Sequence, residues 1–245
     1  MTTNSGLLKL QREAWAFGRA LRNSLLTEFE EEYGVAAPPP ATIGGELLTD
    51  FVGAALSYDA LPLNVFAETT WQGGRPLVTV NSRTVEMRGV KDPVGVSNVG
   101  IWHEAVHVQR DLAVVRVGPQ AVLDGFLPNP TIACYRERLP RARRGGDFER
   151  EYFAEEAGRA AAVSFPHLLQ IEPFRQFIYL AERRLASGSL GWRALYAAAE
   201  AIGVNVSALV KQLEVEGFLH VERSRDKSFL HPQPALGNLL TEGGF

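Results

Sequence analysis

The first thirty-odd residues place apolar side chains at a helical period. These apolar positions recur at steps of three and four residues: Ala14, Phe17, Leu21, Leu25 and Phe29. Charged residues such as Glu13 and Glu28 fall largely on the opposite side, so the segment is predicted to be an amphipathic helix. Gly34 and the prolines at 38–40 end this helix, because proline removes a backbone donor and restricts the residue before it.

After the prolines the pattern stays helical for a short distance and then changes period. Residues 43–56 are predicted to form a second helix. Its apolar face would consist of Leu47, Leu48, Phe51 and Val52. Residues 63–71 and 77–82 are instead rich in β-branched and aromatic residues, and the residues between them are typical of turns. We therefore expect a β-hairpin in this part of the chain.

The middle of the chain returns to a helical pattern over residues 99–112. This helix starts either at Asp92-Pro93, where aspartate is a good N-cap and proline suits the first turn, or at Ser97-Asn98. Residues 113–146 contain four prolines and are predicted to be irregular. Asp147 is then expected to cap a further helix that stops at Pro166.

The last third of the chain predicts short elements and a loosely held tail. The expected elements are helices at about 173–186 and 191–202, a helix from Ser207 to about 216, and a hairpin of Phe218–Val221 with Ser228–His231. Taken together, the patterns predict an α+β fold in which helices accompany a short antiparallel sheet.

Composition narrows the class of protein. With 245 residues, 46% hydrophobic and 22% charged, the chain resembles an average soluble globular protein and is long enough for a self-sufficient core. Its single cysteine, Cys134, forms no internal disulfide, which favours a reducing compartment, and we expect a cytoplasmic location.

Charge and hydropathy exclude two further classes. The net charge of −3 argues against a surface that tracks nucleic acid throughout. The first residues carry a lysine and a glutamate within their apolar stretch, unlike a signal peptide, and no segment approaches the roughly 20 apolar residues of a membrane span.

Residues 103–107 carry the chemistry that the sequence reveals. They read His-Glu-Ala-Val-His, the pattern H-E-x-x-H, inside the predicted helix 99–112. Residues four apart share one helix face, so His103 and His107 can both bind one Zn²⁺ ion. Glu104 lies one step round the helix, where its carboxylate can act as general base on a water that the ion activates. This is the arrangement of a zinc metalloprotease.

A catalytic zinc ion takes three protein ligands, so one more ligand is needed. The acidic residues of the predicted helix 147–165 are the best candidates: Glu149, Glu151, Glu155 and Glu156. Small residues in the second half of that helix, among them Gly158, would allow it to approach the first helix closely. Spacing alone does not choose among the four glutamates.

The order of these motifs resembles that of the ImmA/IrrE family of zinc metallopeptidases over most of the chain. The matching features are the proline step at 38–40, a strand ending in Asn81-Ser82, the H-E-x-x-H motif, and a helix with a pattern like E-x-x-A-[ND] at residues 151–155. The resemblance makes Glu151 the expected third ligand. Glu155 then stands in the place of the family's asparagine or aspartate, where it would support the ligands from outside.

The chain also departs from the family pattern. Ala105 and Val106 replace the usual middle pair of the motif, and Pro166 falls about two residues late relative to Glu151. This offset leaves Glu155 as an alternative ligand. The chain is identified as a divergent member.

The resemblance implies a small gluzincin-like metallopeptidase core over residues 1–170 and a helical, winged-helix-like domain over 171–245. It implies a cytoplasmic zinc endopeptidase that cleaves a Cro/cI-type helix-turn-helix repressor, with Glu104 as general base. By analogy with related folds, residues 78–81 would form the sheet edge on which an extended substrate pairs.

Residues 195–219 have features of a helix-turn-helix. Gly203 suits the turn, and the two strands predicted after it would supply a basic wing. Binding of DNA through the second helix is one interpretation. However, that helix carries Glu214 and Glu216 beside Lys211, and phosphate contacts need cations. We therefore favour packing or substrate docking for this segment over DNA binding.

Three functions remain open from the sequence. The first is a zinc endopeptidase acting on a repressor, which the intact His-Glu-His set favours. The second is a DNA-binding regulator that retains the protease fold. The third is a metal-binding sensor without proteolytic activity. The second and third functions would not require Glu104.

Overall fold

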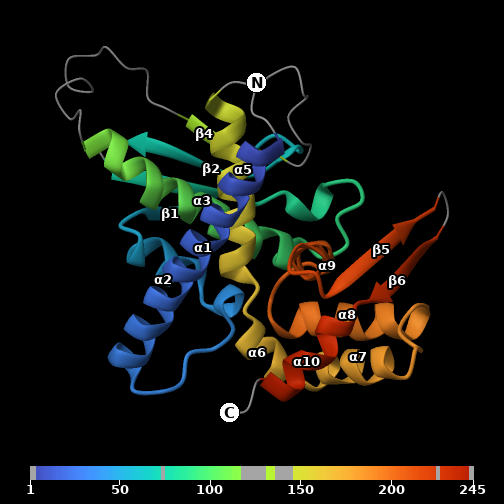
Figure 1. The fold of residues 1–245 in the computed structure, drawn as a ribbon. Coiled ribbons are helices and arrows are strands. Elements are labelled where there is room, and N and C mark those ends of the chain that lie inside the picture. Colours follow the sequence, from blue (N-terminus) through green and yellow to red (C-terminus); the bar gives the residue numbers. More distant parts are fainter. Residues whose placement is uncertain (1–3, 73–74, 117–130, 136–145, 225–226, 243–245) are drawn as a thin grey trace. The chain divides into compact units, whose positions relative to one another are not determined.

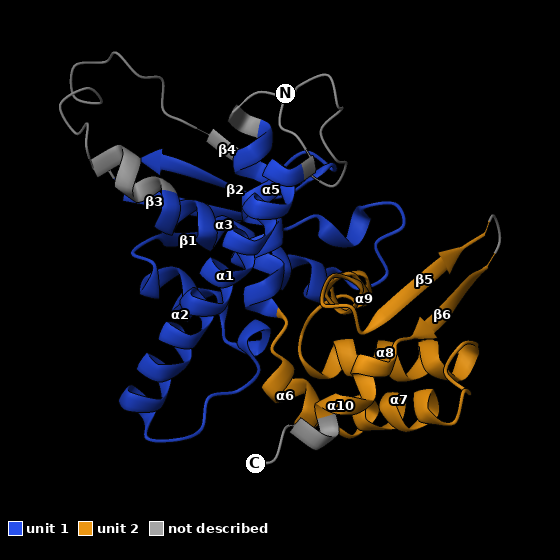
Figure 2. Cartoon of the chain, in the orientation of Figure 1, with its two compact units in different colours: residues 1–162 blue, residues 163–245 orange. Residues whose placement is uncertain are grey.

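The computed structural model describes residues 4–72, 75–116, 131–135, 146–224 and 227–242. Its fold is α+β, mostly helical, with a small mixed sheet. The chain divides into two compact units, residues 1–162 and 163–245 (Figure 2). The boundary predicted from the sequence lies at residue 170.

Three long helices form the body of the first unit: α1 (Asn4–Tyr33), α3 (Pro93–Arg116) and α5 (Gly146–Ala162). Both α1 and α3 pack on α5 (Figure 1). The apolar stripe predicted for α1 is buried at Ala14, Leu21 and Leu25. Helix α3 begins at Pro93, the earlier of the two starts considered, and Asp92 Oδ1 accepts a hydrogen bond of 2.9 Å from the backbone N–H of Gly95.

The second helix is shorter than predicted. After the 3₁₀ turn η1 (Pro40–Thr42), α2 spans only Gly45–Phe51, and Gly53 then turns the chain with φ +75°. Ala55 and Leu56, predicted as the end of this helix, instead belong to strand β1 (Ala55–Asp59). Leu47 is 39% exposed, so it is not part of the expected apolar face, whereas Leu48 and Val52 are buried.

The predicted hairpin is confirmed as β2 (Val65–Gln72) paired antiparallel with β3 (Arg75–Asn81). The sheet order is β1-β3-β2-β4, and β1 runs parallel to β3, so the expectation of a purely antiparallel sheet is wrong. Strand β4 (Thr131–Tyr135) lies in the stretch predicted to be irregular. Because β3 lies between two strands, residues 78–81 are not an edge, and among the described strands the edges are β1 and β4.

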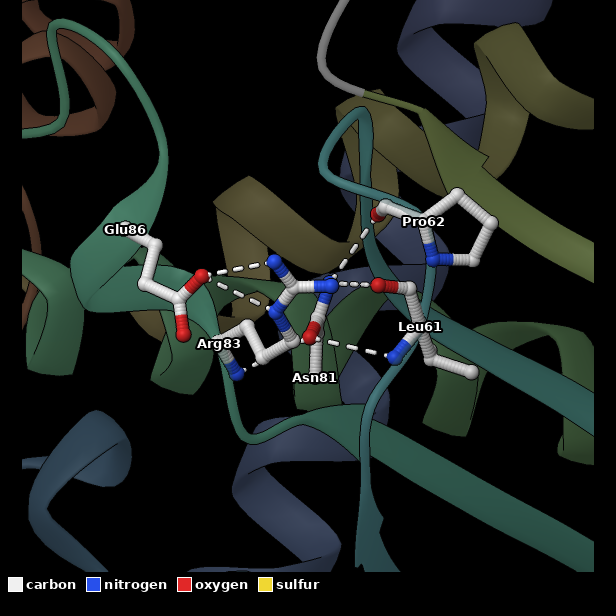
Figure 3. Close-up of polar contacts among 5 residues, drawn as sticks. All are labelled: Leu61, Pro62, Asn81, Arg83 and Glu86. Atoms are coloured by element: carbon white, nitrogen blue, oxygen red, sulfur yellow. Dashed lines mark hydrogen bonds and ion pairs between the residues drawn. The ribbon is translucent and has the colours of Figure 1, made fainter.

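Asn81, at the end of β3, holds the segment that leads into β2 (Figure 3). Its amide nitrogen donates to the carbonyl oxygens of Leu61, Pro62 and Val65, and its amide oxygen accepts from the backbone N–H groups of Leu61 and Arg83. The side chain is buried, and these bonds use its full capacity as donor and acceptor. The asparagine of the Asn81-Ser82 motif therefore fixes where β2 begins. The 3₁₀ turn η2 (Thr84–Glu86) follows.

The second unit consists of short helices and one hairpin. Its elements are α6 (Phe165–Gln170), α7 (Glu172–Glu182), α8 (Ser189–Ala201), α9 (Val206–Val215), β5 (Leu219–Arg223), β6 (Ser228–Pro232) and α10 (Pro234–Glu242). Pro166 lies in the first turn of α6, where its missing N–H costs nothing, so it does not end the preceding helix, which stops at Ala162.

Two predictions for the second unit, the cap of its helix α9 and the state of its tail, are wrong. Asn205, not Ser207, caps α9, because the Asn205 side chain accepts from the Ala208 N–H at 2.9 Å. The tail forms helix α10 and buries Leu236, so it is not loosely held over residues 234–242.

Among the described residues, no single helix has the length and hydropathy of a membrane span. Helices α8 and α9 reach that length and hydropathy only when taken together, and the pair is bent by 106°.

Candidate metal centre

The two histidines of the H-E-x-x-H motif lie one turn apart on α3 and are buried. His103 is 6% and His107 is 1% exposed, and their Nε2 atoms are 3.0 Å apart. Two ring nitrogens that face each other at this distance cannot both carry a hydrogen, so at least one presents a lone pair. Ala105 and Val106, which depart from the family pattern, are fully buried core residues.

Glu151 reaches the same point from α5. Its two carboxylate oxygens lie 3.4 Å from His103 Nε2 and 3.4 Å from His107 Nε2, respectively. One ligand atom from each of the three residues lies within 4.8 Å of the others. Within the described part of the chain, this is the one group of histidine, cysteine and acidic residues close enough to share a metal ion.

The distances among these three residues suit a small metal ion. Ligand atoms arranged tetrahedrally at about 2.0–2.2 Å from zinc lie roughly 3.3–3.6 Å from one another. The observed separations of 3.0 and 3.4 Å are close to this range. Two imidazoles and one carboxylate are a donor set of catalytic zinc sites, and a similar set binds ferrous iron in oxygenases.

A glycine on α5 allows the two helices to approach so closely. A Cβ atom at Gly158 would lie 2.8 Å from both the Cα and the N atom of His103, closer than real Cβ contacts come. Ala154, Ala157 and Ala161 beside it are buried. The small residues expected from the sequence to permit close approach therefore lie at this contact, and Gly158 is the one that touches the His103 backbone.

Glu104 is completely buried beside the histidines. Its Oε2 atom accepts a hydrogen bond of 2.6 Å from Thr69 Oγ1 on β2, while its Oε1 atom has no hydrogen-bond partner among the described residues. Thr69 was not predicted from the sequence. The alternation of β2 gives its side chain an inward direction, but only the packing of α3 on β2 brings it to Glu104.

The two glutamates of the site have different electrostatic environments in the metal-free protein. Burial raises the pKa of Glu104 above 4.5, an effect that the two histidines and the Thr69 hydroxyl oppose only in part. Burial acts in the same direction on Glu151, but its contacts with His103 and His107 outweigh burial and lower its pKa to about 2. Glu151 is therefore an anion over the whole neutral range.

The other three candidate glutamates of α5 lie away from the histidines. Glu149 is exposed. Glu155 is also exposed and forms an ion pair of 3.7 Å with Arg159. Glu156 is buried, but its carboxylate binds residues of α1. The structure thus brings Glu151 to the histidines and leaves Glu155, the alternative ligand, outside the group.

No protein-family model matches the chain, and no curated protein or solved structure is significantly similar to it. The resemblance to the ImmA/IrrE family therefore stays a prediction that rests on the motifs.

Proposed function

We propose that the chain is a zinc-dependent endopeptidase. The observation that carries the proposal is a single cluster of buried and half-buried side chains. His103, His107 and Glu151 form a group able to bind an ion, and Glu104 lies beside it with one carboxylate oxygen that has no partner within the described residues. A binding-only metal site has no use for a buried, half-satisfied carboxylate, because burying one is costly.

The residues of the cluster have separate tasks in this proposal. His103, His107 and Glu151 would hold the ion, and zinc, when bound, polarises a carbonyl group and makes water a good nucleophile at neutral pH. Glu104 takes a proton from the attacking water at Oε1 and passes it to the nitrogen of the leaving amine. The pKa of Glu104, raised by burial, suits a group that must both accept and release a proton.

The proposed substrate is a helix-turn-helix repressor of the Cro/cI type, and the proposed location is the cytoplasm. The substrate follows from the ImmA/IrrE resemblance alone. The location follows from that resemblance and from the single cysteine.

For the second unit, which we propose is winged-helix-like, substrate docking or packing is better supported than DNA binding. The unit has eight lysines and arginines against eight aspartates and glutamates, so it has no excess of cations for phosphate contacts. Glu214 on α9 also forms an ion pair of 2.8 Å with Arg223 on β5, which neutralises a cation that a wing would offer to DNA. Leu209 and Leu213 of α9 are fully buried, which supports a packing role for this helix.

The test compares wild type with Glu104→Gln, both loaded with zinc, on a proteome-derived peptide library and a panel of Cro/cI-type repressors. We expect Glu104→Gln to retain one zinc per chain and to lose about 100- to 10,000-fold in cleavage rate, because a general base contributes that much. Glu155→Gln, a change of an exposed residue on α5, serves as the matched control and should cleave normally.

Three results would contradict the proposal. Equal cleavage by wild type and Glu104→Gln would exclude Glu104 as the base. Zinc binding without any cleavage would favour a metal-binding sensor. Tight duplex DNA binding that falls steeply with salt and survives in His103→Ala would instead favour a DNA-binding regulator.

A further inference from the structure

We propose that Thr69 is a positioning residue that orients Glu104 for catalysis. This inference rests on the proposed function, because it concerns the same site. The observation behind it is the 2.6 Å hydrogen bond from Thr69 Oγ1 to Glu104 Oε2, formed where both side chains are 0% exposed.

The bond distinguishes the two oxygens of one carboxylate. Oε2 is held by the threonine hydroxyl, whereas Oε1 is buried and has no hydrogen-bond partner among the described residues. A carboxylate that can rotate presents either oxygen to a substrate, but one that is fixed at Oε2 presents Oε1 only. Thr69 therefore selects Oε1 as the oxygen that accepts the proton.

The strand that carries Thr69 is suited to fixing a side chain. β2 is an inner strand, hydrogen-bonded to β3 on one side and to β4 on the other. Threonine is β-branched, so its χ1 angle has few accessible values. Asn81 also fixes the entry into β2 through its bond of 2.7 Å to the Val65 carbonyl oxygen. The hydroxyl thus comes from a rigid support, as catalytic geometry requires.

A purely structural role makes a different prediction. If Thr69 served only to satisfy a buried carboxylate, its removal would lower stability without a specific effect on the chemical step. A positioning role requires kcat to fall while KM and zinc affinity stay the same, since Thr69 is not one of the three residues that would bind the ion.

The experiment uses the full chain with Thr69→Val, which removes the hydroxyl at similar size, and Thr69→Ser, which keeps it. The control is Thr79→Val, because Thr79 is also buried in the sheet, on β3, but its hydroxyl bonds Ser57 at 3.0 Å. Kinetics are measured on the library peptide that wild type cleaves fastest. Zinc affinity is measured by competition with a chelator.

We expect Thr69→Val to lose roughly 10- to 100-fold in kcat, as when residues that orient a metal site are removed, with KM and zinc affinity unchanged. Thr69→Ser should restore most of the rate, and Thr79→Val should keep it. A Thr69→Val variant with wild-type kcat, or one whose loss Thr69→Ser does not relieve, overturns the proposal and leaves the proposed function standing.

A second measurement tests the contact without any activity. Melting temperatures of the metal-free protein are compared for wild type, Thr69→Val, Glu104→Leu and the double variant. We expect the double variant to melt well above the temperature that adding the two single shifts predicts, because removing both partners leaves no buried polar group unpaired. Additive shifts overturn the proposal. Coupled shifts in a zinc-binding protein that cleaves nothing would refute the proposed function, and with it the catalytic role of Thr69.

Discussion

Helix α5 carries a half-buried carboxylate, Glu151, on its side toward α3 and a buried one, Glu156, on its side toward α1, and the two have different partners. Glu151 meets two imidazoles at 3.4 Å. Glu156 meets the guanidinium of Arg159 at 2.5 Å and accepts hydrogen bonds from Gln11 at 3.0 Å and Trp15 at 2.9 Å. One helix therefore offers both a structural and a candidate functional carboxylate.

The difference lies in where the positive charge comes from. Burial opposes the ionisation of both groups, and in Glu156 the charge of Arg159 and the hydrogen bonds outweigh burial and lower the pKa. Glu156 thus has its cation within the protein. Glu151 instead faces two imidazoles at the spacing of metal ligands, so a metal ion is the cation that would complete its site. The partners of a carboxylate held away from solvent, rather than the degree of its burial, therefore indicate its role.

The largest expected effect separates the two carboxylates by metal binding. Glu151→Gln should weaken zinc binding by more than the roughly 100-fold that loss of an outer supporting residue can cost, because a direct ligand is removed. Glu156→Gln should bind zinc as wild type does. Chelator competition measures both affinities, and equal weakening by the two substitutions would remove the distinction.

For the stability of the fold we expect the opposite order, with Glu156→Gln causing the larger loss. Glu156→Gln leaves the buried Arg159 without its main partner, so we expect a loss of about 3 kcal/mol in the free energy of unfolding of the metal-free protein. Denaturant titration measures it, with Glu155→Gln as the exposed control on the same helix. A loss below the uncertainty of the measurement would mean that the Glu156 network contributes nothing.

Zinc itself should stabilise the fold through Glu151. At free zinc 100 times the dissociation constant, binding to the folded state alone adds about 2.7 kcal/mol to the free energy of unfolding. A chelator should reverse the gain, and Glu151→Gln should show much less of it at the same zinc concentration. Thermal melting with and without zinc tests this, and an identical gain in Glu151→Gln would place the ion elsewhere.

Two glycines allow the two helix contacts to be disturbed separately. A Cβ atom at Gly158 would lie 2.8 Å from the His103 backbone, and one at Gly18 of α1 would lie 2.1 Å from the Ala157 carbonyl oxygen. Each glycine-to-alanine change should cost about 1–3 kcal/mol of stability by overpacking. Only Gly158→Ala should also weaken zinc binding, because it displaces α3 at the site. If Gly18→Ala weakens zinc binding equally, the two sides of α5 are not independent.

The smallest expected effect is a dependence on pH. Because the pKa of Glu156 is lowered below 4.5, its contribution to stability is fully present above that pH and is lost as the pH falls through the folded-state value. Wild type should therefore lose more stability than Glu156→Gln when the metal-free proteins are taken from pH 7 to acid. Denaturant titrations at several pH values measure the difference, and parallel curves would contradict it.

The pairing of His103 with His107 was predicted from local spacing alone. Four residues on a helix always return to the same face, so the histidine pair and its neighbour Glu104 could be predicted without knowing what packs on them. The same reasoning succeeded for the α1 stripe and for the β2–β3 hairpin, whose residues also lie close in sequence.

Prediction failed where distant segments meet. Residues 55–56 have a helical apolar pattern, but they join the sheet because β3 offers Leu77 and Val78 as parallel partners. The prediction that residues 78–81 form a sheet edge is wrong for the same reason, since β1, which lies outside the hairpin, pairs with β3. No local pattern contains the identity of the neighbouring strand.

The sequence alone determined the chemistry of α3: two histidines and a glutamate at helical spacing. Only the tertiary structure decided which glutamate of α5 joins them and which oxygen of Glu104 is held by Thr69. The choice of Glu151 depends on the register at which Gly158 lets α5 cross His103, and that of the Glu104 oxygen depends on the packing of β2 on α3. Spacing along one helix is a property of its own backbone, whereas register between elements is set by the packing of the whole core.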